Sequence, residues 1–94
     1  MSTTSPQAVG EPIRVTIDSN FNFNPDPVSV PVGGSVIWVN TDTMIHTATA
    51  DNGSFDTGNI PGGASSQPIK FNAAGSVPYH CTPHPFMTGT VIVT

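Results

Sequence analysis

The chain has 94 residues, of which only 9% are charged, against about 25% in an average globular protein. Its ten prolines and nine glycines favour a β-rich domain with many turns. The net charge is −4 and Arg14 and Lys70 are the only fixed cations, so no nucleic acid is expected as a partner. No apolar run approaches the roughly 18 residues of a membrane span, and the single cysteine excludes an internal disulfide.

The two ends of the chain differ in composition. Residues 1–10 are small and polar and are expected to form a flexible N-terminal arm, with 11–94 as a single domain. This arm contains no apolar segment of the kind found in a signal peptide. The protein is therefore either cytoplasmic or a chain from which a leader has been removed.

The first half of the domain alternates between apolar and polar residues, with period two. Strands are expected at 13–17, 28–30 and 35–40. Between the first two lies a break rich in Asn and Pro, in which Phe21 and Phe23 are expected to point inward. Gly33 and Gly34 make a turn into the run of residues 35–40, which has the highest β propensity in the chain.

The second half continues in the same way, with strands expected at 46–51, 66–71, 77–81 and 88–94. A glycine-rich loop is expected over residues 52–64. Because proline has no N–H, Pro78 requires a bulge or an unpaired position in its strand. No helical periodicity is present, so the fold class is all-β, a Greek-key β-sandwich or barrel of seven or eight antiparallel strands. Trp38 and Phe71 are expected in the core.

The most informative segment runs from Tyr79 to Met87. Cys81, His84 and Met87 lie three residues apart on a loop between two strands, and two prolines stiffen that loop. A thiolate, an imidazole and a thioether form a soft to borderline ligand set. With a second imidazole, they make the His2Cys site with a weak axial Met that suits copper in electron transfer.

Two further histidines are available as the second imidazole. His46 opens a strand after a short turn and would converge from a different strand end. Strand alternation places Val77, Tyr79 and Cys81 on one face, so His80 points the other way. His46 is therefore the expected ligand, and His80 is expected to lie at or near the surface. A lone Cys is most often a small buried hydrophobe, and a lone Met such as Met44 fills space at the rim.

These residues resemble the cupredoxin family of type 1 blue copper proteins. The loop Cys-Thr-Pro-His-Pro-Phe-Met, preceded by Tyr-His, resembles the copper loop of amicyanin-like members. Earlier segments resemble plastocyanin-like domains, so that the resemblance covers about residues 13 to 94. These segments are Phe21-x-Phe23, Pro25, Gly33 to Asn40, and His46-Thr47.

The resemblance implies the cupredoxin fold and a small soluble blue copper protein, which shuttles single electrons and is not an enzyme. It implies one type 1 copper ion, held by His46, Cys81, His84 and Met87, with no catalytic residues. Redox partner proteins are expected to dock briefly at an apolar patch around His84, and the protein is expected to be a periplasmic monomer. The alternatives are a copper-binding carrier and an engineered graft of the loop onto a cupredoxin body. Zinc is expected to compete for the same ligands.

One position departs from the family pattern. Cupredoxins often have Asn directly after the first His ligand, where it bonds across to the Cys loop, whereas this chain has Thr47. A hydroxyl could serve in the same place, but this departure weakens the expectation of a tie between the two ligand segments.

Overall fold

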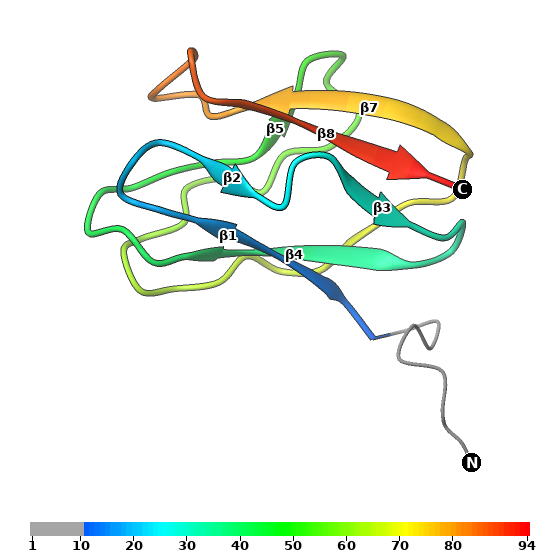
Figure 1. Cartoon of the computed structure of the whole chain (residues 1–94), viewed down its shortest axis with the longest axis horizontal. Helices are drawn as coiled ribbons and strands as arrows, with labels where there is room; N and C mark the ends of the chain where they lie inside the picture. The colour runs from blue at the N-terminus through cyan, green and yellow to red at the C-terminus, as the bar shows by residue number, and fades with distance from the viewer. Residues whose placement is uncertain (1–10) are drawn as a thin grey trace.

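The computed structural model describes residues 11–94 as two four-stranded sheets packed face to face (Figure 1). One sheet has the order β2-β1-β4-β6 and the other β3-β8-β7-β5. The expected arm at residues 1–10 lies outside the described residues. The strands are β1 (Ile13–Ile17), β2 (Phe23–Asn24), β3 (Val28–Val30), β4 (Ser35–Asn40), β5 (Thr49–Ala50), β6 (Ile69–Lys70), β7 (Gly75–His80) and β8 (Thr88–Val93).

The core lies between the two sheets and is built by strand alternation. In β4, Val36, Trp38 and Asn40 are buried, whereas the alternate Ile37 and Val39 are half-buried. β4 is therefore buried on its inner face and only partly covered on its outer face. Trp38 is the largest buried side chain and stacks on Phe55, with ring centroids 5.4 Å apart. The expectation that Trp38 and Phe71 belong to the core is confirmed.

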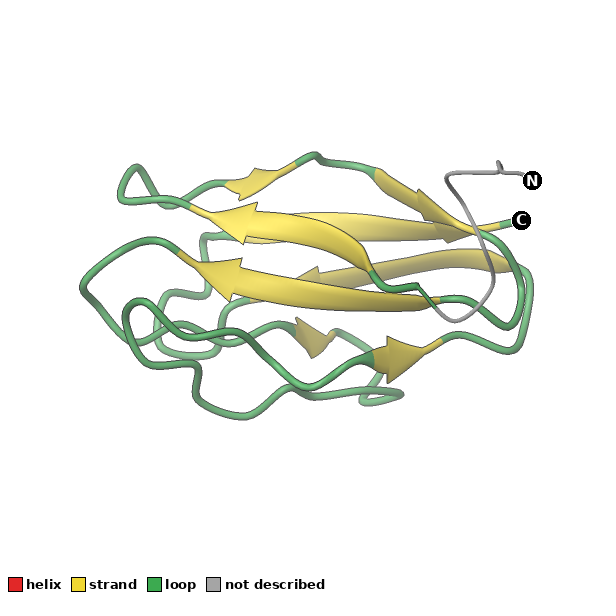
Figure 2. Ribbon diagram, turned by 90° about the horizontal axis from the view of Figure 1, so that it is seen from below, coloured by secondary structure: helices red, strands yellow, loops and turns green. Residues whose placement is uncertain are grey.

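The all-β sandwich of eight strands is confirmed, but the expected antiparallel pairing is wrong at two places. β1 pairs with β4 in parallel, and β3 pairs with β8 in parallel. The chain leaves the first sheet after β2, contributes β3 to the second sheet, and returns as β4 beside β1 (Figure 2). A crossover of this kind brings a strand back in parallel, whereas a hairpin would reverse it.

Two expected strands are much shorter than the sequence pattern indicates. The run 46–51 keeps only the two residues of β5, and the run 66–71 keeps only the two of β6. Around them, the 52–64 loop forms isolated bridges that pair His46 with Ile60 and Thr49 with Asp56. The loop therefore satisfies backbone groups that longer strands would otherwise pair.

Pro78 lies in a continuous register opposite Thr90, so β7 contains no bulge at this position. The carbonyl of Pro78 accepts the N–H of Asp51, just past the end of β5. Since the N and O of one strand residue face the same neighbour, the missing N–H of Pro78 faces the point where β5 has ended. The unpaired position that the sequence required is therefore supplied by the short β5.

No helix among residues 11–94 is long and apolar enough to cross a membrane.

Candidate metal centre

The sequence-predicted ligands meet at one end of the sandwich. β4 and β7 both run toward this end, where β4 leads into the turn 41–46 and β7 leads into the loop 81–87. The loop 81–87 is orange to red in Figure 1 and lies beside the ends of both sheets. Two segments that are far apart in the sequence are thereby brought together at a single site.

Backbone hydrogen bonds hold the loop 81–87 in a compact form. The N–H of His84 donates to the carbonyl of Cys81 at 3.1 Å, and the N–H of Met87 donates to His84 at 2.9 Å. The N–H of Cys81 donates to the carbonyl of Met87 at 3.0 Å, which closes the loop on itself. Two successive four-residue turns, each sharing His84, therefore place Cys81, His84 and Met87 at regular intervals.

Three donor atoms converge inside this end of the protein. The Nδ1 atoms of His46 and His84 each lie 3.5 Å from Sγ of Cys81. The ligand atoms of these three residues all lie within 4.8 Å of one another. Among the described residues 11–94, the three residues form a group that could hold a metal ion. His46 and Cys81 are fully buried and His84 is half-buried. The structure thus brings together three of the four predicted residues as one donor set.

Met87 is also buried, at 1% exposure, and belongs to the hydrophobic core. Its backbone is hydrogen-bonded to Cys81 and His84, so its Cα is tied to these two residues. The fourth predicted residue therefore lies in the same loop, on the inward side.

Asp42 is a functional residue that the sequence analysis missed. Its Oδ2 lies 2.8 Å from Nε2 of His46, and both side chains are buried. This hydrogen bond lowers the pKa of the Asp42 carboxyl, so the carboxylate accepts and Nε2 of His46 donates. Nδ1 of His46 then carries the free lone pair, facing Cys81. Asp42 and His46 are four residues apart in the sequence, but this spacing alone does not indicate a contact. The turn between them brings the two side chains together.

Asn40 fixes the turn that carries Asp42 and His46. Its Nδ2 donates to the carbonyls of Met44 and Ile60 at 2.7 and 2.8 Å, and its Oδ1 accepts the N–H of Asp42 at 2.9 Å. A fully buried amide therefore braces the turn with two hydrogen bonds and ties it to the 52–64 loop with a third, through Ile60.

Thr47 connects the two ligand segments, although it departs from the family pattern at this position. Its Oγ1 accepts the N–H of Thr82 at 2.8 Å, and its own N–H donates to Sγ of Cys81 at 3.3 Å. The backbone N–H of Thr47 is therefore aimed at the sulfur. The hydroxyl thus takes over the cross-loop tie, while the backbone polarises the sulfur.

His80 lies outside this group, as its strand parity predicts. Its Nδ1 is 2.6 Å from Oδ1 of Asp51, and both residues are at the surface or partly exposed. The pair forms a carboxylate–imidazole contact of the same kind as Asp42–His46, but in a solvated setting.

Phe21 lies against the site in a rare backbone conformation. Its φ is 62°, which a bulky side chain seldom adopts. Oδ1 of Asp18 accepts the N–H groups of Asn20 and Asn22, which holds this turn in place. The ring centroid of Phe21 lies 5.2 Å from that of His84 and 5.3 Å from that of Phe86. Phe21 is therefore half-buried beside the site and packs against the core, and Phe23 is buried, so both point inward as expected.

Large apolar side chains are exposed near the ligands. Met44, Ile45 and Phe86 are 45%, 49% and 70% exposed, and they come from the two ligand segments. These residues, with the exposed Pro83 and Pro85, are called the apolar rim below.

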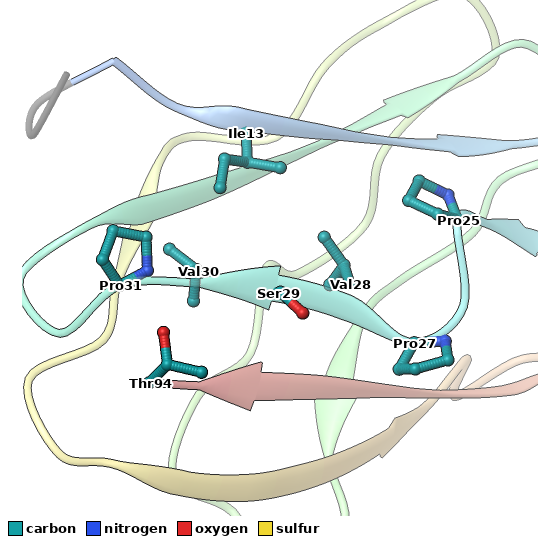
Figure 3. Close-up of a pocket in the computed structure, with 8 residues that line it drawn as sticks. All are labelled: Ile13, Pro25, Pro27, Val28, Ser29, Val30, Pro31 and Thr94. Atoms are coloured by element: carbon teal, nitrogen blue, oxygen red, sulfur yellow. The ribbon is translucent and has the colours of Figure 1, made fainter. Parts of the chain in front are cut away.

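An apolar groove lies elsewhere, between β1 and β3 (Figure 3). None of the side chains that line it is ionisable, and its polar side chains are the two hydroxyls of Ser29 and Thr94, so it offers no donor set for a metal. The lining residues are Ile13, Pro25, Pro27, Val28, Ser29, Val30, Pro31 and Thr94.

Two imidazoles and a thiol that converge at one end of a β-sandwich define a class of metal-binding sandwich proteins. A family model described as "Copper binding proteins, plastocyanin/azurin family" matches residues 11–94. The chain belongs to this family.

Individual relatives agree with this assignment. Amicyanin-alpha of Methylorubrum extorquens is 33% identical over 79 residues, covering 80% of this chain and 66% of the relative. Amicyanin of Paracoccus versutus is 40% identical over 70 residues, covering 70% and 53%. The structure of a reduced amicyanin mutant matches with a TM-score of 0.80 at 30% identity, covering 88% of this chain and 82% of the other. The chain thus spans about half to two thirds of the curated relatives' length, and it is amicyanin-like in fold and loop.

Proposed function

We propose that His46, Cys81, His84 and Met87 hold one copper ion and that the protein carries single electrons. The observation that supports this most strongly is the placement of the Nδ1 atoms of His46 and His84, each 3.5 Å from Sγ of Cys81 in a buried site. Residues 11–94 would act as one domain in this role, as a carrier and not as an enzyme.

The donor set fits copper by its chemistry. A soft thiolate with two imidazoles and a nearby thioether is the set that suits copper in electron transfer. When bound, copper supplies a one-electron couple between its two oxidation states. The chain supplies a buried thiol for deprotonation, and the N–H of Thr47 stabilises the resulting charge on sulfur.

The remaining residues keep the donors in fixed positions. Asp42 holds the tautomer of His46, and the wound backbone of 81–87 limits the motion of Cys81 and His84. A preorganised donor set changes little in geometry when its charge changes, which suits rapid electron transfer.

His84 is the proposed exit for the electron, because it is the half-buried ligand and lies under the apolar rim. An uncharged rim of this size suits brief docking to redox partner proteins, since small redox interfaces are weak. The proposal includes a monomeric protein that acts in the periplasm, by analogy with the copper-binding family to which the chain belongs.

The direct test is to add Cu(II) to the purified protein and record its visible spectrum. Wild type should develop an intense thiolate-to-copper band, which a mild reductant bleaches reversibly. Cys81→Ser should lose the band, because it removes the thiolate. His80→Gln serves as the matched control and should keep it, since His80 contacts Asp51 and not the donor set.

The same sample separates an electron carrier from a copper carrier. An electron carrier keeps its copper through repeated oxidation and reduction in the presence of a chelator. Loss of copper to the chelator in each cycle would favour the copper carrier. A folded but colourless wild-type protein would contradict the proposed site.

A further inference from the structure

Thr49 occupies the centre of a hydroxyl cluster beside the donor set. Its Oγ1 lies 3.0 Å from Oγ1 of Thr47, 3.0 Å from Oγ1 of Thr82 and 3.0 Å from Oδ1 of Asp56. Thr47 follows ligand His46, and Thr82 follows ligand Cys81. Asp56 comes from a third segment, the 52–64 loop. One hydroxyl therefore contacts both ligand segments and the loop that covers them.

The direction of every bond in this cluster follows from the donor count. A carboxylate has only acceptors, so the Thr49 hydroxyl donates its single hydrogen to Asp56. Thr49 can then only accept from Thr47 and Thr82, and both of these hydroxyls donate to it. With its hydrogen directed at Thr49, the oxygen of Thr47 turns its lone pairs toward the N–H of Thr82. Each donor then has one acceptor, and no other arrangement of the hydroxyl hydrogens satisfies all four hydrogen bonds.

We propose that Thr49 and Asp56 are positioning residues of the metal centre, which orient the Thr47 hydroxyl and so hold the His46 and Cys81 segments together. This inference rests on the proposed function for its consequences at the metal, but not for the cluster itself. Asp56 sets the polarity, Thr49 transmits it, and Thr47 makes the contact with the cysteine loop.

The consequence for the sulfur follows from the backbone of Thr47. Its N–H donates to Sγ of Cys81 at 3.3 Å, and its side chain accepts the N–H of residue 82 at 2.8 Å. The two contacts span the same gap between the two segments. If the side chain of Thr47 turns away, the cysteine loop shifts relative to residue 47, and the hydrogen bond to the sulfur lengthens.

Asp56 is suited to this part because its own position is fixed. Its Oδ1 also accepts the N–H of Gly58 at 2.9 Å, and Asp56 and Thr49 form a β-bridge. The carboxylate is exposed, but its backbone is tied to β5. Mutating residues that hydrogen-bond to metal ligands typically lowers metal affinity by roughly 10- to 100-fold. Because this cluster is partly exposed, we expect an effect near the lower of these two values.

The first experiment uses the metal-free protein and measures amide hydrogen exchange by NMR. In Thr49→Val, the Thr47 hydroxyl loses its acceptor, so the Thr82 amide should exchange roughly fivefold faster. Thr49→Ser keeps the hydroxyl and should leave the rate unchanged. Thr16→Val makes the same atomic change on β1, in the other sheet, and should also leave it unchanged.

The second experiment uses the Cu(II) protein and measures the rate of copper release to a chelator, together with the thiolate-to-copper band. Thr49→Val should release copper about tenfold faster and shift the band. Asp56→Asn should act in the same direction with a smaller effect, because its amide oxygen can still accept. Thr49→Ser and Thr16→Val should match wild type.

The outcomes are distinct. Thr49→Val that matches Thr49→Ser in both amide exchange and copper release would overturn the inference. Equal effects of Thr49→Val and Thr16→Val would also overturn it, because they would reflect only a general loss of stability. A colourless wild type with a Thr82 amide that still responds to Thr49→Val would support the cluster and contradict the proposed function.

Discussion

Two carboxylate–imidazole pairs occur in this small protein, and their surroundings differ. Asp42 and His46 are buried beside the donor set, whereas Asp51 and His80 lie partly exposed on the surface. A carboxylate that accepts from a ligand imidazole fixes its tautomer and raises its basicity. The Asp51–His80 contact is partly exposed, so water competes for both partners and the contact orients the imidazole only weakly.

Replacing Asp42 should therefore weaken copper binding. In the wild type, the N–H of Thr43 and the Nε2–H of His46 donate to separate carboxylate oxygens of Asp42, whereas Asp42→Asn leaves only one carbonyl oxygen to accept from both. We expect roughly tenfold weaker Cu(II) affinity and a higher reduction potential, because a less basic imidazole favours the reduced ion. Competition with a chelator and spectroelectrochemistry would measure both.

Asp51→Asn is the matched control for this prediction, since it changes the other carboxylate of the same kind. It should alter neither the affinity nor the potential. Equal effects of the two substitutions would mean that Asp42 acts only through the overall charge.

The sequence predicted which residues meet at this end of the sandwich, but not the residues that support them. The three-residue spacing of Cys81, His84 and Met87 is a local pattern, and a loop of seven residues converts it directly into a site. Asp42 and Thr49 act through contacts that a turn and a sheet create. No spacing rule indicates such contacts, because the partners of Thr49 come from three separate segments.

At the scale of elements, the 52–64 loop supports the turn that carries His46. A Cβ at Gly62 would lie 2.7 Å from the carbonyl oxygen of Asp42 and 2.8 Å from that of Thr43. These are backbone atoms, which cannot rotate away. Gly62 is thus needed because the loop and the turn approach each other closely.

Gly62→Ala should displace the turn and impair the metal centre. We expect a lower free energy of unfolding, by about 1–3 kcal/mol, together with faster release of copper from the folded protein. Thermal unfolding of the metal-free form and chelator competition would measure the two effects separately.

Gly34→Ala offers a control with a similar overlap, because its Cβ would lie 2.8 Å from Cγ2 of Val30. Gly34 precedes β4, whereas His46 follows it, so the two lie at opposite ends of the strand. This variant should lose stability but keep the copper release rate of wild type. Similar release rates in both variants would show that the loop does not support the turn specifically.

The sequence predicted the number of strands and the alternation of the core, but it overestimated two strand lengths. Alternation extends through 46–51, yet β5 has only two residues, because the 52–64 loop pairs with its flanks. Parallel pairing was also missed, since period-two alternation is the same for both directions. Pairing partners depend on the path of the chain, which local patterns do not specify.

At the scale of the whole molecule, one of the two fixed cations lies far from the apolar rim. Lys70 pairs opposite Ser35 at the start of β4, whereas the apolar rim lies beyond its far end. The rim itself contributes no charged side chain. Docking through it should therefore depend on apolar contact, with little electrostatic steering.

Electron self-exchange between the Cu(I) and Cu(II) proteins tests this expectation, because two copies would dock rim to rim. The exchange rate can be measured by NMR line broadening at low and at high salt concentration. Electrostatic steering changes association rates by roughly tenfold or more, so we expect a much smaller change between the two salt concentrations. Phe86→Lys places a charge on the most exposed rim residue and should slow exchange at low salt, with recovery at high salt. Val32→Lys changes an exposed apolar residue in the turn before β4 and should leave the rate close to that of wild type. A steep salt dependence in wild type, or equal slowing by the two lysines, would show that the electron leaves through another surface.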